Sequence, residues 1–144
     1  MPGPSHSGAM LHGFMAYLVK CAVTGEPYTI LGYKGKQVRD NIHCRDLVAA
    51  FMEVVKRPVN AAVYNIGGGV HSNCSVLEAI ELVQEKSGRE ISYSLSPENR
   101  TGDHIWWISD IRKFQNDYPD WRMHWDIGRI VADLVESASE RFKP

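Results

Sequence analysis

Residues 28–43 read YTILGYKGKQVRDNIH, two short stretches of β-forming character on either side of a glycine turn. Tyr28 to Leu31 and Gln37 to His43 have the composition of short strands, and Gly32-Tyr33-Lys34-Gly35 between them is a turn signal. The stretch therefore predicts two strands that the chain connects tightly.

Helical patterns lie on both sides of these strands. Apolar residues recur at helical spacing from Ala9 to Ala22, and Gly25 with Pro27 stops this first helix. A second helix is expected to end at Arg57-Pro58. The apolar positions of the two helices are Leu11, Phe14, Met15, Leu18, Val19 and Ala22 in the first, and Leu47, Phe51, Val54 and Val55 in the second.

Further along, Ala62 to Ile66 has the pattern of a buried strand and runs into Gly67-Gly68-Gly69. Ser75-Val76-Leu77-Glu78 is a capping box, in which the hydroxyl accepts from a first-turn N–H while the carboxylate accepts from the cap N–H. This motif predicts a helix from Ser75 to about Gly88.

The last third continues the alternation of strands and helices. Ile91, Tyr93 and Leu95 alternate with polar residues as in a half-buried strand, and a polar loop, 96–104, leads to a second apolar run, 105–108. A short helix from Asp110, a break at Pro119 and a final helix complete the chain; the apolar residues of that last helix are Ile127, Ile130, Val131 and Leu134. The order α, β, β, α, β, α, β, α, α, without repeat or linker, predicts one α/β unit over residues 1–144.

Composition excludes several classes of function. The 144 residues are 44% hydrophobic and 23% charged, and 16 basic residues nearly balance 17 acidic ones. A net charge of −1 gives no field to attract nucleic acid or an anionic membrane. Cys21, Cys44 and Cys74 are an odd number of cysteines without CxxC spacing, so neither a disulfide framework nor a structural zinc site is expected. This favours a reducing cytoplasm. The one long apolar stretch, 10–23, is too short to span a bilayer and has no basic segment before it.

Two arginine-bearing loops are candidates for anion binding. Arg39 follows the glycine turn at a strand start, where its guanidinium could clamp a phosphate; the alternative is a structural ion pair with Asp40. In Asn99-Arg100-Thr101-Gly102-Asp103, the glycine allows a tight turn and Asp103 could accept from a sugar diol. The alternative there is an ordinary polar loop.

Other motifs are weaker. Gly67 to Gly69 resembles a dinucleotide loop only in part, because Ser72 stands where GxGxxG needs its third glycine. Tyr17 and Lys20 are one residue too close for a Tyr-x-x-x-Lys pair, so no catalytic residue is assigned. The histidines, His6, His12, His43, His71, His104 and His124, have no metal-ligand spacing, so no metal site is assigned. Trp106 and Trp107 could stack on a base, but core positions are favoured.

Taken together, HSGAMLHGF, YKGKQVRDNIH, VYNIGGG and NRTGDHIWWISD resemble the C-terminal half of the extended short-chain dehydrogenase/reductases, Rossmann-type enzymes that act on nucleotide sugars. Within that family the chain is most similar to the CDP-paratose 2-epimerases, also called CDP-tyvelose epimerases. The resemblance implies several helices with short strands, and it places Gly3-Pro4 just after the segment that carries the catalytic tyrosine and lysine. The NAD-binding half would then lie outside this sequence.

The resemblance also implies roles for particular residues. Arg39 matches the arginine of the family's RD motif and Arg100 that of its RxGD motif, and both contact the diphosphate in the family. Asp103 matches the aspartate of RxGD, close to the ribose. The backbone of Tyr28, Thr29 and Ile30 matches the strand over which the base lies. Asp46 matches an acid that we interpret as structural, and Asn65 with Gly67 to Gly69 matches the NxGxG strand end.

These matches lead to an expected function and two alternatives. The expectation is the substrate-binding part of an NAD-dependent nucleotide-sugar epimerase, for which a CDP-sugar is the expected ligand. Such a part would bind no NAD and perform no catalysis alone, and its uncovered faces, the first helix and residues 62–66, would favour a homo-oligomer. One alternative is a free-standing module that binds a nucleoside diphosphate or a protein. The other is a truncated, non-functional fragment that self-associates.

Overall fold

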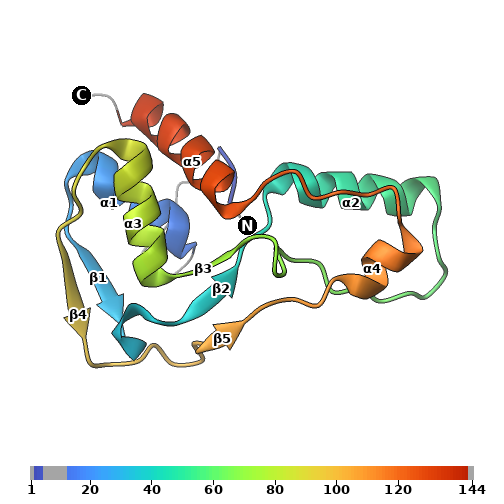
Figure 1. The fold of residues 1–144 in the computed structure, drawn as a ribbon, viewed down its shortest axis with the longest axis horizontal. Helices are drawn as coiled ribbons and strands as arrows, with labels where there is room; N and C mark the ends of the chain where they lie inside the picture. The colour runs from blue at the N-terminus through green and yellow to red at the C-terminus, as the bar shows by residue number, and fades with distance from the viewer. Residues whose placement is uncertain (1, 5–12, 143–144) are drawn as a thin grey trace.

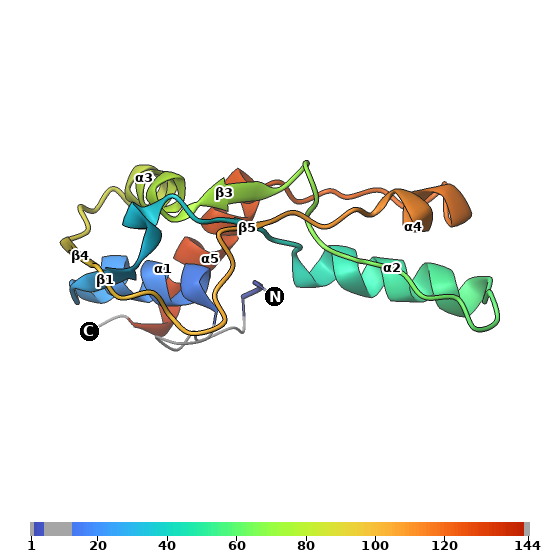
Figure 2. The same ribbon diagram turned by 90° about the horizontal axis from the view of Figure 1, so that it is seen from below.

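The fold divides into a helical lobe and an extended arm (Figure 1). The computed structural model describes residues 2–4 and 13–142. In the lobe, α1 (Phe14–Thr24), α3 (Val76–Ser87) and α5 (Ile127–Arg141) pack together beside β1 (Tyr28–Leu31) and β4 (Tyr93–Ser96). The arm carries α2 (Cys44–Lys56) and α4 (Arg112–Asp117). Figure 2 shows the same division from below.

Of two small sheets, one belongs to the lobe and the other lies between the lobe and the arm (Figure 1). β1 pairs in parallel with β4, from Tyr28 opposite Tyr93 to Leu31 opposite Ser96. β2 (Val38–Asp40) lies at the centre of the second sheet, antiparallel to β3 (Asn73–Ser75) and parallel to β5 (Trp106–Trp107). A 3-10 turn (η1, Tyr33–Gly35) joins β1 to β2, so the two strands expected around the glycine turn are confirmed, although they belong to different sheets.

Each part has its own hydrophobic core. In the lobe, α1 buries nearly its whole length against α3 and α5, with Leu18 and Val19 almost fully inaccessible. In the arm, Phe114 packs edge-on against Trp121 and beside Tyr118, and Ile42 and Ala50 close this second core. The first helix, expected to present an uncovered face, is therefore covered by the chain itself; its predicted start at Ala9 and Leu11 lies outside the described residues.

The hydrogen bonds at the start of α3 confirm the predicted capping box. The Glu78 N–H donates to Ser75 Oγ at 3.2 Å, and the Ser75 N–H donates to Glu78 Oε2 at 2.7 Å, which is the predicted capping box. The helix ends at Gly88, as predicted, with that glycine in the left-handed region.

The expected strand at Ala62 to Ile66 is wrong. The segment is not part of either sheet, and Val63 is 79% exposed. Instead, Lys113 Nζ donates to the Val63 carbonyl at 2.7 Å, and the Tyr64 hydroxyl donates to Asp117 at 2.7 Å. The segment has the composition of a strand. A strand needs a neighbouring strand, however, and none pairs with this segment in the described part of the chain.

The alternation expected around Ile91 is only partly present. Ile91 is buried, whereas Tyr93 and Leu95 on β4 are exposed at 47% and 56%. The prediction for the tryptophan pair is also wrong, because Trp106 and Trp107 are 66% and 52% exposed. β5 contains only these two residues and lies at the edge of its sheet.

Candidate functional site

A cleft of about 580 Å³ opens between the N-terminal end of α1, strands β1 and β2, and the loop that precedes β5. Its lining includes all six residues that the sequence singled out for ligand binding: Tyr28, Thr29, Ile30, Arg39, Arg100 and Asp103. These residues come from three separate segments of the chain, and the fold brings them together on one concavity. A volume of this size is within the usual range for small-molecule sites.

Strand β1 forms one wall of the cleft. Tyr28 and Ile30 are buried, while Thr29 points to the other face and its hydroxyl lies 3.5 Å from Ser94 on β4. Alternation along a strand explains this difference. Burial, followed by the nearby Cys21, Tyr17 and Asp103, raises the pKa of Tyr28 from 10.0 to about 12. The phenol is therefore neutral at physiological pH and able to donate a hydrogen bond.

Arg39, on β2, is fixed by two acceptors. Its Nη1 donates to the Val38 carbonyl at 2.7 Å, and its Nη2 donates to Asp103 Oδ1 at 2.5 Å. The structural partner expected from the sequence was Asp40, but that carboxylate accepts instead from the backbone N–H groups of Gly69 and Ser109. The ion pair of Arg39 thus joins β2 to the loop formed by residues 100–103, the RTGD loop.

The loop with Arg100 is shaped by a turn and by a close contact. The Asp103 N–H donates to the Arg100 carbonyl at 3.1 Å, so the two side chains stand at the ends of one four-residue turn. Asn99 packs on Gly32, where any Cβ would collide with the asparagine side chain and where φ is +66°. Gly32 therefore lets this loop approach the end of β1.

The cleft also contains residues that sequence reasoning missed, notably Tyr17, Gln37 and Asn41. Gln37 is 6% exposed, and its Nε2 donates to the Leu31 carbonyl at 3.2 Å. A single glutamine gives no sequence signal for a binding site. The informative feature, a polar side chain buried beside a strand end, is visible only in the fold.

The three glycines after residue 66 serve packing. A side chain at Gly68 would collide with the backbone carbonyl oxygens of Asn41 and Ser72. At Gly67 it would meet the side chains of Asp40 and Ser109. Glycine is needed at Gly68 because two backbone segments approach closely there.

Asp46 is structural, as interpreted from the sequence. It is 2% exposed, and its carboxylate accepts from the backbone N–H groups of His124 and Trp125 at 3.0 to 3.2 Å. Trp125 in turn stacks on His43, with 4.0 Å between ring centroids, and His43 Nε2 lies 3.2 Å from Asp133. These contacts tie the start of α2 to the start of α5.

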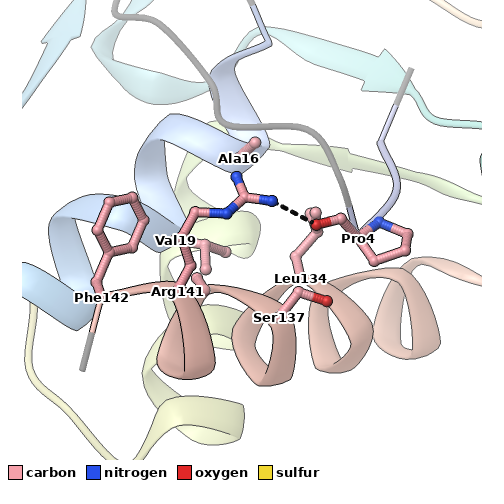
Figure 3. Close-up of a pocket in the computed structure, with 8 residues that line it drawn as sticks. Pro4, Ala16, Val19, Leu134, Ser137, Arg141 and Phe142 are labelled. Carbon is pink, nitrogen blue, oxygen red and sulfur yellow. Dashed lines mark hydrogen bonds between the residues drawn. The ribbon is translucent and has the colours of Figure 1, made fainter.

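A second hollow, between α1 and α5, is of a different kind (Figure 3). Arg141 donates to the Pro4 carbonyl at 2.9 Å across it, and Val19, Leu134 and Phe142 surround it. Its volume of about 10 Å³ admits at most a water molecule. Among the described residues, no group of three or more His, Cys, Asp or Glu side chains could hold a metal ion. No helix in that part of the chain is long and apolar enough to cross a membrane.

Comparison with known proteins gives consistent matches. Residues 1–67 match the NAD dependent epimerase/dehydratase family. The chain is 30% identical over 98 residues to CDP-paratose 2-epimerase of Salmonella typhi, an alignment that covers 67% of this chain and 28% of that enzyme.

Solved structures extend the match to nearly the whole fold. MoeE5 in complex with UDP-glucuronic acid and NAD superposes with a TM-score of 0.83 at 26% identity, over 97% of this chain and 44% of that one. UDP-glucose 4-epimerase from Bifidobacterium longum, in complex with NAD+ and UDP, gives a TM-score of 0.75 at 25% identity, over 89% and 39%. The chain therefore spans less than half the length of the proteins that it matches.

Proposed function

We propose that this chain, a relative of the NAD-dependent epimerases and dehydratases of nucleotide sugars, is the part of such an enzyme that binds the nucleotide sugar. The observation that carries the proposal is the convergence of Arg39, Arg100 and strand β1 on one cleft. MoeE5 and the Bifidobacterium epimerase, whose folds this chain shares, were solved with UDP-glucuronic acid and UDP respectively.

The cleft has the chemistry that a nucleoside diphosphate needs. A pyrophosphate group carries about two negative charges, and a guanidinium can donate two parallel N–H bonds to its oxygens. Each charge-assisted bond contributes about 1.5–3 kcal/mol in favourable cases, and less where water screens the pair. Tyr28 adds a neutral donor, and strand β1 lines the cleft where a base could lie.

The match to the CDP-paratose 2-epimerase of Salmonella typhi supports a CDP-sugar as the ligand of this chain. In a complete enzyme of that kind, NAD would supply the hydride transfers that invert one sugar stereocentre, C2 of a CDP-dideoxyhexose in this branch. The residues of this chain would bind the nucleotide and orient the sugar. We assign no catalytic residue and no NAD contact to residues 1–144, so the chain alone would not turn over a nucleotide sugar.

A second candidate function rests on the outer face of α2. Val48, Phe51, Met52 and Val55 repeat at helical spacing and are all exposed, with Phe51 at 57% and Val55 at 71%. An apolar stripe of this kind marks an interaction surface. It could contact the remainder of an epimerase or, in this chain by itself, a second copy, which would make the chain a self-associating or protein-binding module.

Calorimetry of the purified chain with CDP, UDP, dTDP and NAD tests the proposal. We expect a nucleoside diphosphate to bind weakly, with CDP preferred, and NAD not to bind. Arg100→Ala should lower the affinity about tenfold, from the loss of one screened charge-assisted contact. Arg112→Ala is the matched control, because its guanidinium is exposed and pairs with Asp110 outside the cleft. Equal affinities of the two variants, or turnover by the isolated chain, would contradict the proposal.

A further inference from the structure

The guanidinium of Arg39 is already engaged by the protein. Its Nη2 forms an ion pair with Asp103 at 2.5 Å, and its Nη1 donates to the Val38 carbonyl. Both charged side chains are largely shielded, at 19% and 22% exposure, so this pair is less screened than an ordinary surface ion pair. Each terminal nitrogen therefore already gives one of its two N–H bonds to a protein oxygen.

We propose that Asp103 limits the affinity of the cleft for anions, because it competes with the anionic ligand for Arg39. This inference rests on the proposed function of the cleft as a phosphate site. Each terminal nitrogen of a guanidinium carries two N–H bonds, so a ligand oxygen at Nη2 shares that nitrogen with the carboxylate or displaces it. Binding therefore carries the cost of weakening the Arg39–Asp103 pair.

The number of cations that a ligand reaches decides whether this cost is offset. An anion that meets Arg39 alone exchanges part of one carboxylate contact for one phosphate contact and gains little. A diphosphate can also reach Arg100, which lines the same cleft, and so gains a second cation for the same loss. Because one turn joins Arg100 to Asp103, release of the carboxylate and placement of Arg100 involve the same loop. Arg100 thus gives the preference for a pyrophosphate group, whereas Asp103 lowers the affinity for both kinds of anion.

The test uses inorganic pyrophosphate and orthophosphate as probes, titrated into the full chain and followed by calorimetry. Asp103→Asn keeps the shape of the side chain but removes the charge that holds Arg39. We expect the affinity for both probes to rise about fivefold or more, and by a similar factor, because both lose the same competitor. Glu98→Gln is the matched control, since it removes one exposed negative charge from the neighbouring part of the same loop. It should change either affinity by less than about twofold, because exposed charges are strongly screened.

A double-mutant cycle locates the effect on Arg39. In an Arg39→Ala background, Asp103→Asn should give no gain, because the competitor then has nothing to occupy. Equal or weaker binding by Asp103→Asn, a similar gain from Glu98→Gln, or a gain that persists without Arg39 would each overturn the competition. If wild type binds pyrophosphate and Asp103→Asn shows no gain, only this inference fails. If neither protein binds pyrophosphate or CDP, the proposed function fails with it.

Discussion

Asp40 Oδ2 accepts a hydrogen bond from the backbone N–H of Ser109 at 3.0 Å, across 69 positions of sequence. The same oxygen accepts from the Gly69 N–H at 2.8 Å. One carboxylate therefore joins strand β2, the glycine segment and the stretch that leads to α4. Arg39 directly precedes Asp40 on β2, so these bonds also fix the strand that carries the arginine proposed to contact the phosphate.

Removal of this carboxylate should destabilise the protein. We expect Asp40→Ala to lower the free energy of unfolding by about 1–3 kcal/mol, since two partly buried N–H donors lose their acceptor. Asp110→Ala is the control, because its carboxylate is exposed and meets only the neighbouring Arg112. Urea unfolding followed by circular dichroism measures both. Equal midpoints for the two variants would show that the Asp40 bonds contribute nothing.

The capping box of α3 predicts a pH-dependent stability. Hydrogen bonds from the Ser75 backbone N–H, and then from its side chain, hold the pKa of Glu78 below its ordinary value of 4.5. A depressed pKa stabilises the fold above the ordinary value, and this contribution is lost as the pH falls through the lower, folded-state pKa. Glu78→Ala should thus cost about 0.5–1 kcal/mol at pH 7.

The same substitution should cost much less near pH 3. Unfolding in urea at the two pH values measures the difference, and Glu81→Ala, on the same helix but outside the cap, controls for helix propensity and net charge. A Glu78 effect that is independent of pH would show that the carboxylate does not act through its charge.

The raised pKa of Tyr28 should be detectable as a change in the free energy of unfolding at alkaline pH. Its pKa is raised to about 12, first by burial, so the folded state keeps the proton where the unfolded state has lost it. The contribution is complete below pH 10.0 and declines as the pH rises toward 12. The stability difference between wild type and Tyr28→Phe should therefore change between these two values, as measured by unfolding at several pH values. Tyr93→Phe, on the paired strand, controls for loss of a phenol; the same trend in both variants would exclude Tyr28 as the cause.

The exposed stripe on α2 predicts self-association. Sedimentation velocity at micromolar concentration should show a dimer or larger species for wild type and a shift to monomer for Phe51→Asp, because a charge in an apolar contact is costly. Ala49→Asp places the same charge on the same helix, at an exposed position beside the stripe, and should leave the association in place. A wild-type monomer, or an equal effect of both variants, would contradict this use of the stripe.

The features that sequence reasoning found correctly are local in origin. The capping box needs only Ser75 and Glu78, and the turn after Leu31 needs only its glycines, so neighbouring residues determine them. Arg39, Arg100 and Asp103 were singled out from their loops and given roles by a resemblance, and the fold puts them on one cleft; their role as ligand contacts stays a prediction.

The errors concern what lies next to a segment in space. Ala62 to Ile66 has a strand's composition, yet strand formation depends on a partner that the segment itself does not encode. Trp106 and Trp107 are apolar, but burial depends on residues from elsewhere in the fold, and both side chains are more than half exposed. Gln37 could not be assigned to the cleft because its burial against Leu31 arises only when β1 and β2 come together.

We expect the cleft between β1, β2 and the RTGD loop to bind a nucleoside diphosphate. Titration of the isotopically labelled chain with CDP, followed by two-dimensional NMR, tests it most directly, because each backbone amide reports separately. We predict the largest shift changes at residues 28–31, 37–41 and 99–103, with a weaker response or none on α2. Changes centred on α2, or on the hollow between Pro4 and Phe142, or no change at millimolar CDP, would contradict the account.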